Sequence, residues 1–247
     1  MAVRSGNAGA TDADEPLGEL PAGSFTREDE ERDGRFYDAP RFVQHIDEGA
    51  IAAVTETIRQ YVRPGAEVLD LMSSWVSHLP PAAELPLGRV AGLGMNAGEL
   101  AANPRLDEWV VHDLNHDPWL PYPDSRFDAT LITVSIQYLT RPVPTLRQVA
   151  RVLRPGGVVI VSFSNRMFAT KAVRLWRETP EAARPALVAR YLALAGGFEE
   201  PTVVAYPPSR RWFGGGDPLW TVVTRRVENP PGAARGERGG ATAPLGG

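Results

Sequence analysis

The sequence predicts an α/β protein with a doubly wound, mostly parallel sheet and helices on both faces. Two observations support this prediction: short apolar segments of strand length alternate with segments of helical periodicity, and turn residues separate them. The clearest unit lies between Arg126 and Phe163 and contains an apolar strand, an amphipathic helix, a Pro-Gly-Gly turn and a second apolar strand. Repeated β–α units of this kind form parallel sheets.

The order of the elements follows from the same patterns. Strands are expected at residues 67–72, 89–94, 109–112, 127–134, 158–163, 203–206 and 219–225. Helices are expected over residues 47–62, from Asn96 onward, from Thr145 to the Pro-Gly-Gly turn, and over about 181–195. A turn-rich segment without helical periodicity joins the last two strands, so they should be antiparallel neighbours. The expected sheet therefore has seven strands, the last of them antiparallel.

The composition divides the chain into one domain and two ends. Residues 1–34 are acidic, residues 35–227 hold the alternating elements, and residues 228–247 are rich in Gly, Pro and Ala. Neither end carries enough apolar surface to offset its ordering entropy, so both are expected to be mobile.

Charge and composition also exclude several functions. The net charge is -4 and no basic run is present, which disfavours nucleic acid as a partner. The absence of cysteine excludes disulfides and thiolate metal sites, and His112 and His116 have no further metal-like ligand in sequence, so no metal is expected. No apolar run reaches the length of a membrane span or of a signal-peptide core, and a cytoplasmic protein without a membrane partner is expected.

The segment PYPDSRFDA, which begins at Pro121, and the later segment RVLRPGG, which ends at Gly157, together carry a family resemblance. This part of the chain resembles the second half of class I S-adenosylmethionine-dependent methyltransferases, in the small-molecule, type 11 branch that includes quinone-biosynthesis enzymes. The resemblance spans roughly residues 37–226. It implies a Rossmann-like fold, S-adenosyl-L-methionine as the cofactor and methyl transfer to a small-molecule acceptor.

The resemblance also implies where the cofactor binds. Ligands of open α/β sheets bind beyond the carboxyl ends of the strands. The family places a glycine-rich turn after the first strand, whereas this chain keeps the acidic residue, Asp70, and has Ser73 and Ser74 in a turn without glycine. The candidate cofactor-binding residues are Tyr37, Asp70, Ser73, Ser74, Gly94, Met95, Asn96, Asp113, Leu114, Val134 and Gln137.

Some of these residues have two possible roles. Gly94 stands where the family has a carboxylate that faces the ribose, and Asn96 could either bond a ribose oxygen or cap the following helix. Asp113 matches the residue that faces the adenine amino group, or it is a turn residue. Tyr37 resembles a lid tyrosine near the cofactor carboxylate, although core packing would also explain it.

Catalysis and function are likewise open to alternatives. A base is needed only if the acceptor must lose a proton, and His45, His78 and Tyr138 are the candidates. Arg166 or Lys171 could hold an anionic substrate or be solvated charges. The first alternative function is use of this fold without methyl transfer. The second is an NAD-dependent oxidoreductase, suggested by a Gly-x-Gly-x-x-Ala pattern that begins at Gly92.

Overall fold

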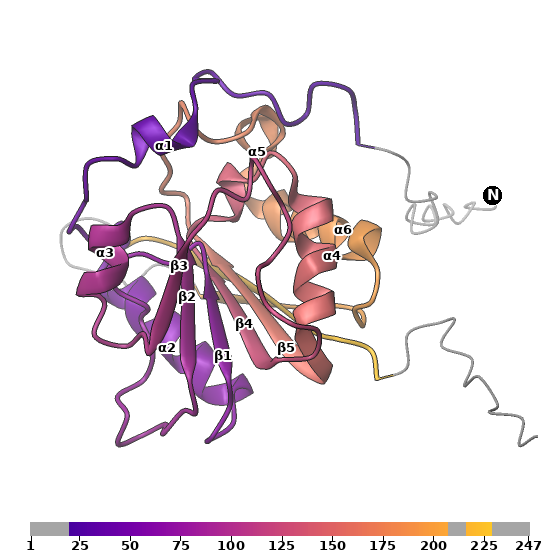
Figure 1. The fold of residues 1–247 in the computed structure, drawn as a ribbon. Helices are drawn as coiled ribbons and strands as arrows, with labels where there is room; N and C mark the ends of the chain where they lie inside the picture. Colours follow the sequence, from indigo (N-terminus) through magenta and orange to yellow (C-terminus); the bar gives the residue numbers. More distant parts are fainter. Residues whose placement is uncertain (1–19, 207–215, 229–247) are drawn as a thin grey trace, which may run out of the picture.

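The computed structural model describes residues 20–206 and 216–228. Its strands form one seven-stranded sheet in the order β3-β2-β1-β4-β5-β7-β6 (Figure 1). The strands are β1 (Val68–Leu71), β2 (Val90–Gly94), β3 (Glu108–Val111), β4 (Phe127–Thr133), β5 (Leu153–Phe163), β6 (Thr202–Tyr206) and β7 (Leu219–Arg225). Strand β7 is antiparallel to β5 and β6, and the pairs among β1 to β5 are parallel. The predicted sheet, with its antiparallel last strand, is confirmed.

Helices cover both faces of this sheet. They are α1 (Asp33–Phe36), α2 (Glu48–Tyr61), α3 (Ala97–Ala102), α4 (Pro142–Val152), α5 (Arg174–Glu178) and α6 (Arg184–Ala195), with 3₁₀ turns η1 (Ile136–Tyr138) and η2 (Glu181–Ala183). The apolar face of α2 packs on one side of the sheet, and α4 and α6 pack on the other side. Among the described residues, no helix is long and apolar enough to cross a membrane.

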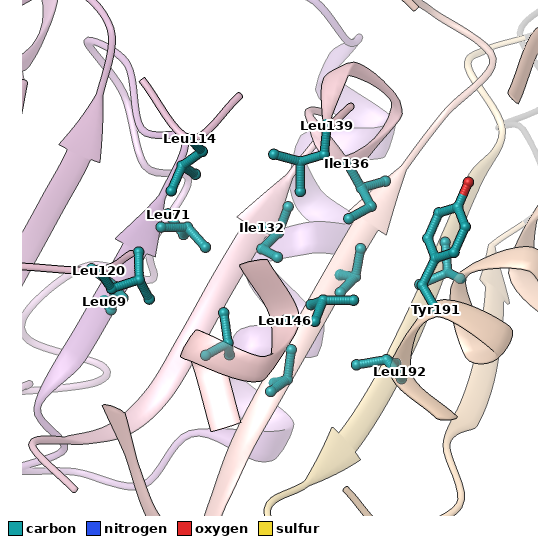
Figure 2. Packing of buried hydrophobic residues seen from close by; sticks show 14 of the residues in the cluster. Leu69, Leu71, Leu114, Leu120, Ile132, Ile136, Leu139, Leu146, Tyr191 and Leu192 are labelled. Atoms are coloured by element: carbon teal, nitrogen blue, oxygen red, sulfur yellow. The ribbon is translucent and has the colours of Figure 1, made fainter. Parts of the chain in front are cut away.

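The central strands are buried on both sides, which explains their continuous apolar sequences. Successive side chains of a strand point to opposite faces, so Leu69 and Leu71 join the cluster under α4 and α6 while Val68 joins the cluster under α2. Figure 2 shows the first of these clusters, in which Leu71 and Ile132 lie at the sheet and Leu146 comes from α4. The rigid core therefore fixes the carboxyl ends of β1 and β4 side by side.

Helix α4 and the Pro-Gly-Gly segment differ from the prediction. The helix begins at Pro142, because proline suits the first turn of a helix, and Thr145 lies inside it and donates its hydroxyl to the carbonyl oxygen of Arg141 at 2.9 Å. The helix ends at Val152. Pro-Gly-Gly then falls within β5, where the pairing with β4 shifts register. The turn is thus a bulge at the start of a strand.

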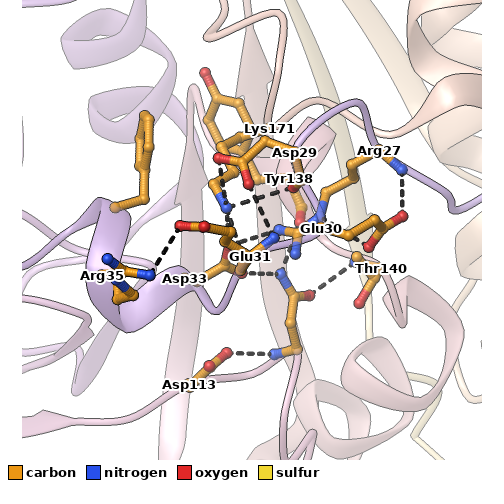
Figure 3. Close-up of polar contacts among 12 residues, drawn as sticks. Arg27, Asp29, Glu30, Glu31, Asp33, Arg35, Asp113, Tyr138, Thr140 and Lys171 are labelled. Atoms are coloured by element: carbon orange, nitrogen blue, oxygen red, sulfur yellow. Dashed lines mark hydrogen bonds and ion pairs between the residues drawn. The ribbon is translucent and has the colours of Figure 1, made fainter.

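The composition predicts a mobile N-terminal segment, yet the described part of the acidic segment, residues 20–34, packs against the domain. Backbone hydrogen bonds, such as that from the Asp29 N–H to the Thr170 carbonyl oxygen at 2.9 Å, hold it there, and so does Lys171, which is 0 % exposed. Its Nζ lies 3.0 Å from the carboxylate of Asp29 and 3.3 Å from that of Asp33 (Figure 3). Lys171 is therefore neither a solvated charge nor a free substrate ligand. Residues 1–19 and 229–247 lie outside the described part of the chain.

Candidate functional site

A cleft lies at the carboxyl ends of β1, β2, β3 and β4. Strands β1 and β4 are neighbours. The connection after β1 packs on the α2 side of the sheet through Leu79 and Leu85, and α4, which follows β4, packs on the other side, so the cleft lies at the topological switch point. All the candidate cofactor residues except Gln137 line this cleft, and so do the candidate bases His45, His78 and Tyr138. The fold thus brings together predicted residues from five separate segments of the chain, the first of which contains Tyr37 and His45.

The backbone at the cleft is strained. Met72 directly follows β1 and has φ 60°, and Val134 directly follows β4 and has φ 51°. His78 has φ 47°. These are three of the four non-glycine residues with positive φ in the described part of the chain, and all three line the cleft. Such conformations are costly for side chains other than glycine, above all for a β-branched valine, and they concentrate at functional sites.

The loop that follows β1, called the first loop from here on, is organised around the buried carboxyl group of Asp70. Asp70 is 3 % exposed, and its Oδ2 accepts hydrogen bonds from the hydroxyls of Ser73 and Ser77, both at 2.6 Å. Burial raises the pKa of Asp70 to about 6, and the two serine hydrogen bonds act in the opposite direction. Asn103 donates to the Ser77 hydroxyl and to the Ser74 carbonyl oxygen, each at 2.8 Å. Side-chain hydrogen bonds therefore shape a turn that has no glycine.

Gly94 has a packing role that the sequence did not reveal. A Cβ atom at this position would overlap the backbone carbonyl oxygen of Ser73, whose N–H donates to Leu93 O at 2.8 Å. The first loop therefore occupies the space beside Gly94. A carboxylate side chain at residue 94 has no room, which explains why the ribose-facing position of the family pattern is glycine here.

Asn96 serves as a helix cap. Its Oδ1 accepts from the N–H of Glu99 at 3.0 Å, and its Nδ2 donates to the carbonyl oxygens of Tyr37 and Asp38 at 2.8 and 2.9 Å. Of the two roles weighed for this side chain, capping is the one the structure has. The amide also holds Tyr37 and Asp38 beside the cleft.

Glu99 is a cleft residue that the sequence prediction missed. It is nearly buried, and its carboxylate accepts from the Arg41 N–H at 2.7 Å and from the Ser74 hydroxyl at 2.8 Å. Glu99 therefore joins Arg41 to the first loop. The spacing of Asn96 and Glu99 indicated only a helix start, and the carboxylate three residues into that helix was the available signal.

Asp113 forms the turn after β3 and also lines the cleft. Its Oδ1 accepts from the N–H groups of Asn115 and His116 at 2.9 and 3.2 Å. The Asn115 side chain then donates to Asp33 at 2.7 Å and accepts from the Thr140 N–H at 2.8 Å (Figure 3). The turn is thus locked both to the N-terminal segment and to the loop after β4.

The loop after β4 contributes Val134, Ser135 and Tyr138. The Tyr138 hydroxyl accepts from the Phe168 N–H at 2.8 Å, and burial raises the pKa of this phenol, so it is neutral at pH 7. The Ser135 hydroxyl is buried without a hydrogen-bond partner among the described residues. Gln137 is 1 % exposed, donates to the Val134 carbonyl oxygen at 3.0 Å and does not line the cleft.

The two candidate histidines lie at the same cleft and are both weak bases. Burial lowers the pKa of His45, whose ring packs edge-on against Phe168 with 5.2 Å between ring centroids. Burial also lowers the pKa of His78, and proximity to His45 lowers it further. Neutral imidazoles at pH 7 can accept a proton from a bound molecule.

The glycines of the dinucleotide pattern lie in a strand rather than in a loop. Gly92 and Gly94 lie within β2, where Gly92 pairs with Asp70 and Trp109. They do not form the loop that a dinucleotide fingerprint requires, and β2 is not the first strand. Among the described residues, no group of three or more potential ligands is placed to hold a metal ion. Arg166 pairs with Asp217 at 2.8 Å at the surface.

The chain is similar to methyltransferases in sequence. Residues 76–161 match the family described as Methyltransferase domain. A demethylmenaquinone methyltransferase from Paenarthrobacter aurescens (strain TC1) is 32% identical over 120 residues, which are 47% of this chain and 44% of that protein. The chain therefore matches less than half the length of this relative.

Solved structures share the fold. The [4+2]-cyclase SpnF aligns with a TM-score of 0.57 and 16% identity over 79% of this chain and 92% of its own. Phosphoethanolamine N-methyltransferase 2 of Haemonchus contortus, in complex with S-adenosyl-L-methionine, aligns with a TM-score of 0.50 and 12% identity over 73% of this chain and 53% of its own. At these identities the likeness establishes the fold alone.

Proposed function

We propose that the chain transfers a methyl group from S-adenosylmethionine to a small-molecule acceptor. The match of residues 76–161 to a methyltransferase domain and the likeness to a demethylmenaquinone methyltransferase support this proposal. The observation that best supports the proposal is the cleft at the switch point, where two strained residues, Met72 and Val134, end the two central strands. A cytoplasmic location, without nucleic-acid or membrane partners, remains a prediction from the composition.

The residues of the cleft fit this cofactor. Ser135 offers a buried hydroxyl with no partner among the described residues, which a ligand would satisfy. Asp113 would face the adenine amino group, and the apolar Met95 and Leu114 would contact the ring. Asp70, bonded to Ser73 and Ser77, would shape the first loop around the ligand.

S-adenosylmethionine supplies a methyl group that its sulfonium already activates. The cleft residues therefore have to align the acceptor and exclude water, and the segment around Tyr37 covers the cleft for that purpose. If the acceptor is a hydroxyl or an acidic carbon, His45 or His78 would take its proton, since both imidazoles are neutral at pH 7.

The test is transfer of radiolabelled methyl groups from S-adenosylmethionine to a panel of small acceptors. The panel begins with demethylmenaquinone, because the sequence relative is named for that substrate. We expect Asp113→Asn to lower kcat/KM for the cofactor by about ten- to hundredfold, the cost of one charge-assisted hydrogen bond. Asp117→Asn is the matched control, because this residue lies in the same loop but outside the cleft. Equal activity of both variants would contradict the assigned role of Asp113.

A second candidate function is chemistry on this fold without methyl transfer. It is favoured by the turn after β1, which has none of the glycines that the family pattern has there. Binding of S-adenosylmethionine with no methyl transfer to any acceptor of the panel would support this alternative.

A further inference from the structure

Arg41 stands out among the residues of the cleft. It is the one lysine or arginine among the described residues that line the cleft, where four acidic residues also lie: Asp33, Asp70, Glu99 and Asp113. A ligand with an anionic group would therefore find a single fixed cation in this cleft.

The guanidinium of Arg41 is held in place by aromatic rings. Its central carbon lies 4.4 Å from the ring centroid of Phe36, 5.6 Å from that of Phe168 and 5.8 Å from that of Tyr37. Nη2 donates to the Phe36 carbonyl oxygen at 2.6 Å, and the backbone N–H donates to Glu99. Stacking and hydrogen bonds thus leave the side chain little freedom.

One nitrogen of this guanidinium has no acceptor. Nη1 is buried and makes no hydrogen bond within the described residues, and no carboxylate there forms an ion pair with the guanidinium of Arg41. Leaving a buried charged donor unpaired is costly, so such groups commonly meet a ligand or water. The planar guanidinium matches the two oxygens of a carboxylate.

We propose that Arg41 binds a carboxylate of a molecule in the cleft. The inference rests on the proposed function. The carboxylate has two possible sources, the amino-acid end of S-adenosylmethionine or an anionic acceptor. In either case Nη1 would donate to the carboxylate, and the aromatic rings would keep the guanidinium aimed at it.

The experiment compares wild type, Arg41→Met and the control Arg35→Met by calorimetry. Arg35 lies in the same segment, but its side chain is 78% exposed and it pairs only with the exposed Glu31. Each protein is titrated with S-adenosylhomocysteine, which has a carboxylate, and with methylthioadenosine, which has none. In a second arm, benzoate and uncharged benzamide are titrated into each protein, alone and with saturating S-adenosylhomocysteine.

If the cofactor supplies the carboxylate, Arg41→Met weakens S-adenosylhomocysteine binding about ten- to hundredfold and leaves methylthioadenosine binding unchanged. If the acceptor supplies it, both nucleosides bind unchanged, while wild type binds benzoate but not benzamide and Arg41→Met loses the benzoate site. Methylthioadenosine also reports that the variant cleft is intact.

Two results would overturn the assignment of Arg41. One is an equal loss of both nucleosides in Arg41→Met, which would mean a structural role. The other is no change in either nucleoside together with no benzoate binding that depends on Arg41. If wild type binds neither nucleoside, the proposed function fails, and the benzoate arm on the protein alone still decides whether Arg41 binds a carboxylate.

Discussion

Asp70 shows, at the scale of a single residue, how the cleft keeps a carboxyl group away from water. The side chain is almost fully buried, no cation pairs with it among the described residues, and two serine hydroxyls are its partners. Because its pKa rises from 3.8 to about 6, the folded protein holds a proton there that the unfolded chain releases.

This difference has a defined sign. Between about pH 4 and pH 6 the folded state binds more protons at Asp70 than the unfolded state, so the contribution of Asp70 to stability falls as pH rises. We expect the free energy of unfolding of wild type, relative to Asp70→Asn, to fall by roughly 2–2.5 kcal/mol from pH 4 to pH 7, which is most of the full effect of this pKa shift at about 1.4 kcal/mol per pKa unit. Urea unfolding of both proteins across this range measures it. A difference that stays constant or grows with pH would contradict the burial of an unpaired Asp70.

Single residues also show where prediction from sequence ends. The identity of Asp113 and its place after a strand are enough to predict that it lies at the cleft. The role of Asn96 was undecidable, because one amide can cap a helix or bond a ribose, and only the position of Tyr37 beside it settles the matter. Glu99 was missed because its partners come from segments far away in the chain.

Gly94 and the first loop depend on each other at the scale of elements. The loop after β1 crosses the end of β2 so closely that a methyl group at Gly94 would overlap the Ser73 carbonyl oxygen. We expect Gly94→Ala to lower the free energy of unfolding by about 1–3 kcal/mol, the usual cost of overpacking. Gly34→Ala, in α1, is the control, since nothing lies within 4 Å of its added methyl group.

Chemical denaturation of both variants decides this point. Equal stability of Gly94→Ala and Gly34→Ala would show that the first loop is not packed as described. The same geometry predicts that Gly94→Asp does not create a ribose contact, because its Cβ has no room.

The elements themselves were predictable to different degrees. Buried strands such as β4 and β5 are continuous apolar runs, so the sequence located them well. The capping pattern predicts that α4 starts at Thr145, but the helix begins at Pro142. Local patterns do not reveal which of two adjacent starts the packing selects. The Pro-Gly-Gly bulge depends on pairing with β4, which is a long-range contact.

The N-terminal segment completes the cleft at the scale of the whole molecule. Its composition predicts mobility, but residues 20–34 are held by the buried Lys171 and by further contacts, such as the hydrogen bond from the Arg174 N–H to the Thr26 carbonyl oxygen at 2.7 Å. Lys171 meets two carboxylates of that segment and donates to the Glu31 carbonyl oxygen at 2.8 Å. The segment then continues over the cleft through Tyr37 and Arg41.

We expect Lys171→Met to release this segment. Removing one partner of a buried ion pair typically costs about 3–5 kcal/mol, because the remaining charges lose their compensation. Trypsin should therefore cleave after Arg27 and Arg32 faster in the variant than in wild type. Arg166→Met is the control, because that side chain is 63% exposed and ion pairs at the surface contribute little to the free energy of unfolding. Equal cleavage rates for wild type and Lys171→Met would mean that Lys171 does not anchor the segment.

The proposed function requires that the cleft at the switch point binds S-adenosylmethionine. The most direct test is calorimetric titration of the full chain with S-adenosylhomocysteine, the demethylated product, and separately with NAD⁺. We expect saturable binding of one S-adenosylhomocysteine per chain and no binding of NAD⁺. A chain that does not bind S-adenosylhomocysteine, or that binds NAD⁺ instead, would contradict it.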